Sequence, residues 1–171
     1  MSDRTVTLGG EKEFSLSGTP VTVGEKARDV TLVDSAGSSV RMLASTGGKV
    51  RLISVVPNIE TSICDLQTRR MNEEAAKLGD NVVILTVSSD LPAVQANWCA
   101  AAGVDQVIML SDHQNLAFGE AYGTKIDDLD REQRSMFVVD ADGVVRYVEY
   151  VPEIGQHPDY DAALAALNEL V

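Results

Sequence analysis

Residues 50–64 read VRLISVVPNIETSIC, and this stretch decides the fold. Its first seven residues are almost continuously apolar and rich in β-branched side chains, which is typical of a strand buried on both faces. Pro57 ends that strand. The segment from about Ser62 to Leu78 is rich in helix formers and predicts a helix, for which Gly79 is the expected C-terminal cap.

The same alternation of strands and helices continues to the C-terminus. We expect further strands at Val82–Val87, Val107–Leu110, Met136–Val139 and Val144–Val151, and further helices from Asp90-Leu-Pro92 onward, at Asn115–Ala121 and at Asp159–Leu170. The turn Ala141-Asp-Gly143 makes an antiparallel pair of the last two strands.

The N-terminal part predicts shorter elements. Thr5 to Val23 alternates polar and apolar residues around Gly9-Gly10, which favours one or two hairpins at the edge of a sheet. A further short strand pair is expected at Val30–Val33 and Val40–Leu43. Together the elements predict an α/β protein with a mixed central sheet flanked by helices and an N-terminal β-hairpin. A thioredoxin-like fold fits this order.

Composition limits the functions to consider. The 171 residues suit a single domain over residues 1–171, with about 1–23 as an N-terminal hairpin region. The formal net charge of −12 argues against nucleic acid or an anionic membrane as a partner. The sequence shows no signal peptide, in which a basic region is followed by an apolar one, and no apolar run long enough to span a bilayer. We therefore expect a cytoplasmic protein.

Two cysteines, Cys64 and Cys99, carry the expected chemistry. In a cytosolic chain a pair of cysteines is more often transient and catalytic than a permanent bridge. Cys64 falls in the first turn or two of a predicted helix, where unpaired N–H groups and the helix dipole favour a reactive thiolate. Thr61 can turn its hydroxyl toward this sulfur, and Pro57 can wall the pocket. Taken alone, a cysteine at a helix start is more often a small buried residue.

The spacing Pro57-x-x-x-Thr61-x-x-Cys64 resembles the active-site motif of the peroxiredoxins. Further stretches resemble the thiol peroxidase subfamily, of the atypical two-cysteine type: Ser88-Ser-Asp-Leu-Pro92, Trp98-Cys99, Leu110-Ser-Asp112, Phe118-Gly-Glu-Ala-Tyr-Gly123, and Arg134 before Met136-Phe-Val-Val-Asp140. The chain departs from the usual pattern at Arg28, Asn58 and Glu60, none of which is a reacting group.

The resemblance implies a thioredoxin-dependent peroxidase that reduces hydrogen peroxide and organic hydroperoxides. It implies that Cys64 is the peroxidatic nucleophile, that Cys99 resolves its sulfenic acid as an intrachain disulfide, and that Arg134 completes the site. Forming that bond requires local unfolding, because the two cysteines lie on different predicted helices. A homodimer is also implied, whereas an organic cofactor and a metal are not.

Two other functions fit part of the pattern. A dithiol oxidoreductase normally uses Cys-x-x-Cys, but Cys64 is followed by Asp65-Leu-Gln67 with no second thiol. A redox-sensing binding protein could use the same cysteine pair as a switch. The remaining candidates are read as structural: Trp98 as packing, Arg131 as a solvated alternative to Arg134, His113 and His157 as surface residues, and Asp112, Asp127, Asp128 and Asp130 as an acidic surface.

Overall fold

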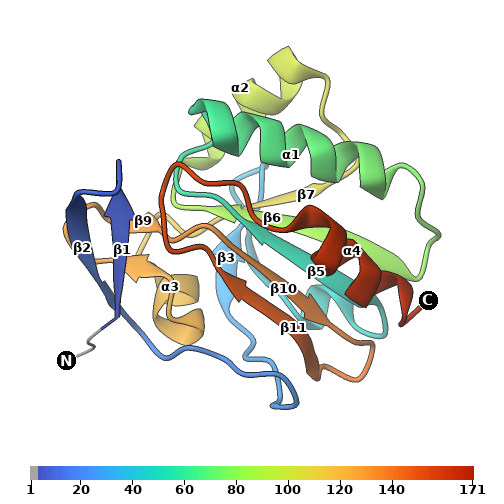
Figure 1. Cartoon of the computed structure of the whole chain (residues 1–171). Coiled ribbons are helices and arrows are strands. Elements are labelled where there is room, and N and C mark those ends of the chain that lie inside the picture. Colours follow the sequence, from blue (N-terminus) through green and yellow to red (C-terminus); the bar gives the residue numbers. More distant parts are fainter. Residues whose placement is uncertain (1–3) are drawn as a thin grey trace.

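A computed structural model describes residues 4–171 and shows a seven-stranded mixed sheet (Figure 1). Its strands, in spatial order, are β11 (Val145–Tyr150), β10 (Ser135–Val139), β5 (Val50–Val55), β6 (Val82–Ser88), β7 (Ile108–Ser111), β3 (Thr31–Val33) and β4 (Ser39–Arg41). The three central strands β5, β6 and β7 are parallel, while β10 pairs antiparallel with both β5 and β11. The predicted mixed sheet is therefore confirmed.

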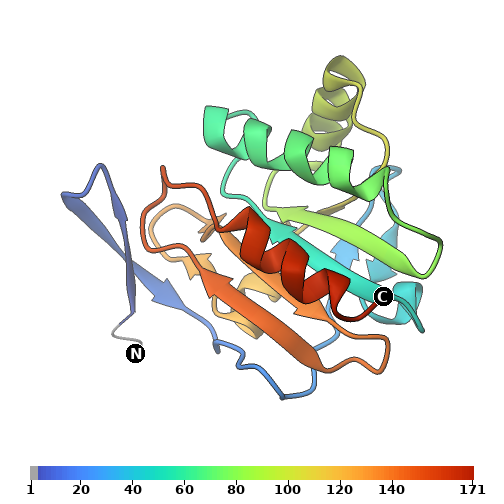
Figure 2. The same ribbon diagram turned by 45° about the vertical axis from the view of Figure 1, so that its right-hand side comes forward.

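Helices cover both faces of this sheet. Helices α1 (Ser62–Ala75), α2 (Pro92–Ala102) and α4 (Tyr160–Asn168) lie on one face, and α3 (Ala117–Tyr122) lies on the other (Figure 2). A short 3-10 helix at Ala44–Thr46 precedes β5. Successive residues of a strand point to opposite faces, so the fully buried strand β5 contributes to both cores.

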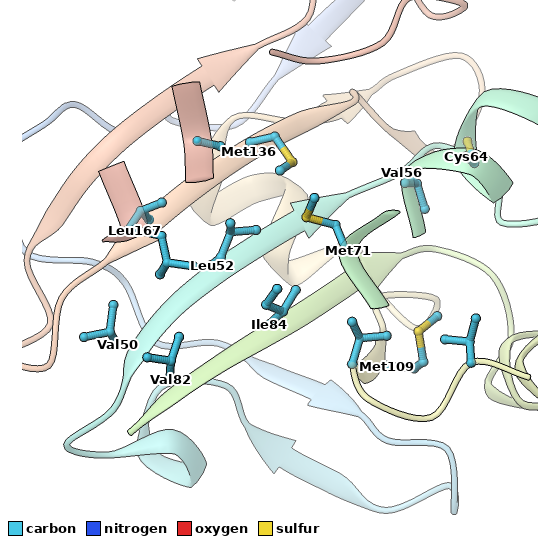
Figure 3. Close-up of a cluster of buried hydrophobic side chains, with 14 of the residues drawn as sticks. Val50, Leu52, Val56, Cys64, Met71, Val82, Ile84, Met109, Met136 and Leu167 are labelled. Carbon is cyan, nitrogen blue, oxygen red and sulfur yellow. The ribbon is translucent and has the colours of Figure 1, made fainter. Parts of the chain in front are cut away.

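The core beneath α1, α2 and α4 extends from the sheet centre to the end of β5. Leu52, Ile84 and Met136 enter it from the sheet, Met71 from α1 and Leu167 from α4. Figure 3 shows Cys64 at one end of this cluster, next to Val56. The first reactive-residue candidate thus lies where the apolar core meets the loop after β5.

The predicted N-terminal hairpin is confirmed, but its position differs from the expectation. Strands β1 (Thr5–Leu8) and β2 (Lys12–Ser17) pair around Gly9 and Gly10. They form a separate sheet with β8 (Lys125–Ile126) and β9 (Arg131–Glu132), rather than the edge of the central sheet. This hairpin stands to one side of the molecule in Figure 1.

Two helix boundaries differ from the sequence prediction. Helix α1 ends at Ala75, because Lys77 N and Leu78 N bond to the carbonyls of Glu74 and Ala75 in tight turns, so Gly79 is not its cap. Helix α3 starts two residues later than expected, because the Asp112 carboxylate accepts hydrogen bonds from the amides of its first turn. The spacing of apolar residues along the sequence does not predict helix ends that are set by such hydrogen bonds.

Candidate active site

Cys64 is the third residue of α1, and its sulfur is almost closed off from solvent. The chain leaves β5, turns through residues 57–61 and enters α1 after the extended N-cap Thr61. The first bond into the helix runs from Asp65 N to Thr61 O, which leaves the amides of residues 62–64 at the unpaired helix end. Cys64 is 1% exposed.

Two N–H groups point at the Cys64 sulfur. The backbone amide of Asn58 and the Nη1 group of Arg134 each donate to Sγ at 3.5 Å. The guanidinium also brings a positive charge close to the buried sulfur.

Arg134 is fixed from two sides. It is 2% exposed, its Nη1 donates to Gln67 Oε1 at 3.0 Å, and its Nη2 donates to the carbonyl of Ile154 at 2.8 Å. Its Nε has no hydrogen-bond partner among the described residues. Arg131, the alternative weighed from the sequence, instead pairs with Asp90 at 2.9 Å. Arg134 is thus the arginine that contacts the sulfur.

Sequence reasoning missed Gln67. This fully buried residue lies one helical turn after Cys64, receives the Arg134 bond on Oε1 and donates from Nε2 to Ser54 Oγ at 2.8 Å. A polar residue three positions after a candidate nucleophile, on the same helix face, is a signal that could have identified it. Gln67 connects the central strand β5 to the arginine.

The loop of residues 57–61 is held by Asp90, a second residue that the sequence did not single out. Asp90 Oδ2 accepts from Ile59 N at 2.8 Å, and Oδ1 accepts from Arg131. Arg131 also donates to the carbonyl of Pro57 at 3.5 Å. Because Asp90 lies just before α2, this network joins the loop beside Cys64 to the start of the helix that carries Cys99.

A cavity of about 320 Å³ opens beside these residues. Its lining includes the polar or charged residues Asn58, Thr61, Ser62, Arg131 and Arg134. The remaining lining residues are Leu8, Pro57, Ile63, Ile126, Leu129, Ile154 and Gly155, all of them without a polar side chain. Pro57 is buried. The Thr61 hydroxyl donates to the carbonyl of Asn58 at 2.8 Å, which leaves its oxygen able to accept a proton donor from the cavity.

Cys99 lies apart from this cluster. It is half-buried in the later part of α2, and both cysteines are free thiols. Burial raises the pKa of the Cys99 thiol. The structure therefore places Pro57, Thr61 and Arg134 around one cavity and Arg134 against Cys64, but leaves Cys99 on the neighbouring helix with no disulfide bond to Cys64.

The residues next to the two cysteines join α1 to α2. Trp98 Nε1 donates to Asp65 Oδ2 at 3.1 Å, and Asp65 also pairs with Arg69. The Arg69 guanidinium lies over the Trp98 ring, 5.6 Å from its centroid. We call Asp65, Arg69 and Trp98 the interhelix clasp. Trp98 packs against the core, as predicted, and also makes this polar contact.

The expected acidic surface is wrong at one position. Asp127, Asp128 and Asp130 are exposed, but Asp112 is 3% exposed and caps α3. Burial raises the pKa of Asp112. Burial, followed by the charge of Asp112, raises the pKa of Glu132 well above its usual range.

The other sequence candidates have ordinary contacts. His157 is exposed beside the Tyr160 hydroxyl, whereas His113 is half-buried against Ser111 Oγ at 2.9 Å. Within residues 4–171 no three histidine, cysteine or acidic side chains are grouped as a metal site. None of the described helices has the length and apolar character needed to cross a membrane.

Comparison with known proteins agrees with this geometry. Residues 22–164 match the Redoxin family. The chain is 52% identical over 162 residues to a thiol peroxidase of Halalkalibacterium halodurans, covering 95% of this chain and 96% of that protein. It is 49% identical over 157 residues to a thiol peroxidase of Bacillus subtilis, covering 92% and 93% of the two chains.

Solved structures extend the comparison to the fold. A peroxiredoxin-like protein from Aquifex aeolicus superposes with a TM-score of 0.89 at 30% identity, over 98% of both chains. A thiol peroxidase from Chromobacterium violaceum superposes with a TM-score of 0.86 at 20% identity, over 98% of this chain and 97% of that one. The predicted thioredoxin-like fold is thereby confirmed. The chain belongs to the Redoxin family, in its thiol peroxidase subfamily of peroxiredoxins, and is a thiol-dependent peroxidase.

Proposed function

We propose that Cys64 is the peroxidatic nucleophile of this enzyme and that Cys99 resolves the oxidised product. The observation that carries this proposal is the Cys64 sulfur at 3.5 Å from both Arg134 Nη1 and Asn58 N, two residues that also line the cavity. Arg134 Nε, buried and without a partner in the described part of the chain, is a donor free to hold a peroxide oxygen.

In the first step the Cys64 thiolate attacks the terminal oxygen of a hydroperoxide ROOH. An S–O bond forms, the O–O bond breaks, and ROH leaves after the alkoxide takes a proton. The thiolate is oxidised by two electrons to a sulfenic acid. Thr61 Oγ1 accepts a hydrogen bond from the O–H group of ROOH, whose hydrogen stays on the oxygen that becomes the S–OH group. Arg134 stabilises the charge that develops on the leaving oxygen. Their positions account for most of the catalysis.

In the second step the Cys99 thiolate attacks the Cys64 sulfur, and the S–OH oxygen leaves as water once protonated. The product is an intrachain Cys64–Cys99 disulfide. The cysteines lie on different helices, and a disulfide needs Cα atoms within roughly 7 Å, so residues 58–66 or 92–102 rearrange locally. A dithiol protein, which we propose is thioredoxin, returns two electrons and restores both thiols.

The substrates are proposed to include both hydrogen peroxide and organic hydroperoxides. The polar lining residues Asn58, Thr61 and Arg134 can hold the O–O group common to both, and the apolar lining residues suit an organic substituent. We further propose that the enzyme works in the cytoplasm as a homodimer formed through the loops around the cavity. Exposed Leu129 at the cavity rim supports that interface, and sedimentation analysis tests it.

The deciding experiment measures peroxide consumption with thioredoxin, thioredoxin reductase and NADPH. Cys64→Ser should lose turnover and fail to form sulfenic acid. Cys99→Ser should lose turnover but still form one sulfenic acid per chain, detected by a sulfenic-acid probe and mass spectrometry. Activity of Cys64→Ser equal to wild type would overturn the proposal and favour a redox switch that binds a partner in one state only.

A further inference from the structure

The N-terminal hairpin reaches the active-site cavity through the segment after β11. Thr7 N donates to the carbonyl of Pro152 at 2.9 Å, and Ile154 N donates to the carbonyl of Thr7 at 2.7 Å. These bonds form a parallel bridge between Thr7 and Glu153. Elements near the two ends of the chain are thus joined beside the site.

The carboxylate of Glu153 holds the tip of the hairpin. It accepts from Gly9 N at 2.6 Å, from Gly10 N at 3.2 Å and from the Thr7 hydroxyl. Gly9 and Gly10 have φ values of +66° and +71°, so the turn needs glycine and its amides face the carboxylate. The Thr7 bond, followed by the bonds of these amides, lowers the pKa of Glu153, which is therefore ionised at neutral pH.

This attachment places two groups at the cavity. Leu8 lies between Thr7 and Gly9, is 46% exposed and lines the cavity. Ile154 also lines the cavity, and its carbonyl accepts the Nη2 bond of Arg134. The base of the hairpin is held by the short pairing of β2 with β8, but its tip contacts this end of the molecule through Glu153. The strands of the hairpin are also held by the buried side chains of Val6, Phe14 and Leu16, so the Glu153 carboxylate fixes the turn rather than the whole hairpin.

We propose that Leu8 is a specificity-determining residue and that Glu153 is the positioning residue that keeps it at the cavity. The hairpin then forms the outer wall for the organic group R of a hydroperoxide ROOH. Hydrogen peroxide has no such group and gains nothing from this wall, whereas each methylene group buried there changes affinity by about fourfold. The inference rests on the proposed function, because it assumes that ROOH reacts with Cys64 from this cavity.

The test compares the second-order rate constants for Cys64 oxidation by cumene hydroperoxide and by hydrogen peroxide in single-turnover experiments on the full chain. A variant that also disturbs Arg134 should change both rate constants by the same factor, so the ratio of the two constants is not affected by that disturbance. Leu8→Ser and Glu153→Ala should each lower the ratio about tenfold, as partial loss of one leucine contact predicts. Glu153→Gln, which keeps one acceptor oxygen, should give an intermediate ratio.

Two further measurements separate positioning from a general loss of structure. In the double variant Leu8→Ser/Glu153→Ala the ratio should fall no further than in either single variant, because both changes remove the same wall. Amide exchange at Gly9 and Gly10 should accelerate in Glu153→Ala but not in Leu8→Ser. Val23→Ser is the matched control, since Val23 is an exposed apolar residue of the same region outside the cavity, and its ratio should equal that of wild type.

A wild-type ratio in both Leu8→Ser and Glu153→Ala, with accelerated exchange at the two glycines, would overturn the inference and leave the proposed function intact. Additive effects in the double variant would overturn the positioning role of Glu153. Failure of wild-type Cys64 to react with either peroxide would overturn the proposed function, and this inference with it.

Discussion

The two cysteines lie on neighbouring helices in contrasting surroundings. Cys64 sits at the start of α1 beside two N–H donors, one of them a buried guanidinium. Cys99 sits in the later part of α2 among apolar side chains, and within residues 4–171 its thiol has no polar partner. Burial raises the pKa of Cys99, and no cation offsets that effect.

This contrast fits the two proposed steps, oxidation of Cys64 by peroxide and formation of the disulfide with Cys99. The polar frame around Cys64 is assembled before any substrate arrives, through Gln67, Asp90 and the loop of residues 57–61. The surroundings of Cys99 protect it instead, because a buried thiol is a weak nucleophile. Under the proposed mechanism, the reaction with peroxide uses this ordered arrangement, and disulfide formation requires part of it to unfold.

The largest effect is expected from removing the charge beside Cys64. In Arg134→Met the sulfur loses one donor, and Gln67 Oε1 and the Ile154 carbonyl lose theirs. The rate constant for Cys64 oxidation should fall roughly 10²- to 10³-fold, as for other lost donors to a developing charge. Stopped-flow peroxide oxidation measures this. Arg131→Met is the matched control and should fall much less; equal losses would contradict the distinction between the two arginines.

The next effect concerns the protonation of Cys99. Since its pKa is raised, the thiol form dominates at neutral pH, and the rate of disulfide formation from a pre-formed sulfenic acid should rise about tenfold per pH unit between pH 6 and 8. Acid quenching and mass spectrometry follow the disulfide. Cys99→Ser should show no disulfide at any pH. A rate independent of pH over this range would mean that Cys99 ionisation does not limit the step.

The sequence predicted the position of Cys64 better than it predicted the residues that hold the site around it. The buried strand, the proline and the helix start are local features, so the position of Cys64 in α1 followed from about fifteen consecutive residues. Arg134 was identified only through the family resemblance, because it meets Cys64 from 70 residues away.

The residues that sequence reasoning missed act through contacts between distant segments. Gln67, Asp90 and Glu153 look like ordinary polar residues until the sheet brings their partners close. Asp112 was assigned to the surface because acidic residues are mostly exposed, yet it is paired with Glu132 and buried. Propensity and periodicity describe neighbours along the chain and carry no information about such pairs.

A smaller effect is expected from opening the interhelix clasp. Trp98→Phe removes the Nε1 donor to Asp65 while keeping an aromatic ring near Arg69. Loss of one hydrogen bond of about 1 kcal/mol should ease local unfolding and speed disulfide formation about fivefold. The rate of Cys64 oxidation in the same experiment is the internal control. Slower or unchanged disulfide formation would show that the clasp does not oppose the rearrangement.

The smallest effect is expected in the pH dependence of folding stability, through the buried residue Glu132. Glu132 lies two residues before Arg134, is fully buried, and has a raised pKa because of burial and the nearby Asp112. A carboxyl group with a raised pKa in the folded state stabilises the fold fully below its unfolded pKa of about 4.5, and that contribution is lost as pH rises through the folded value.

In Glu132→Gln an amide that does not titrate replaces the carboxyl group, so this titration disappears. Urea unfolding should show that the variant loses less stability than wild type between pH 5 and 8, by on the order of 1 kcal/mol, since one unit of pKa shift corresponds to about 1.4 kcal/mol. Glu73→Gln, an exposed glutamate on α1, should follow the wild-type pH dependence. If Glu132→Gln also followed it, titration of Glu132 would not contribute to the pH dependence of stability.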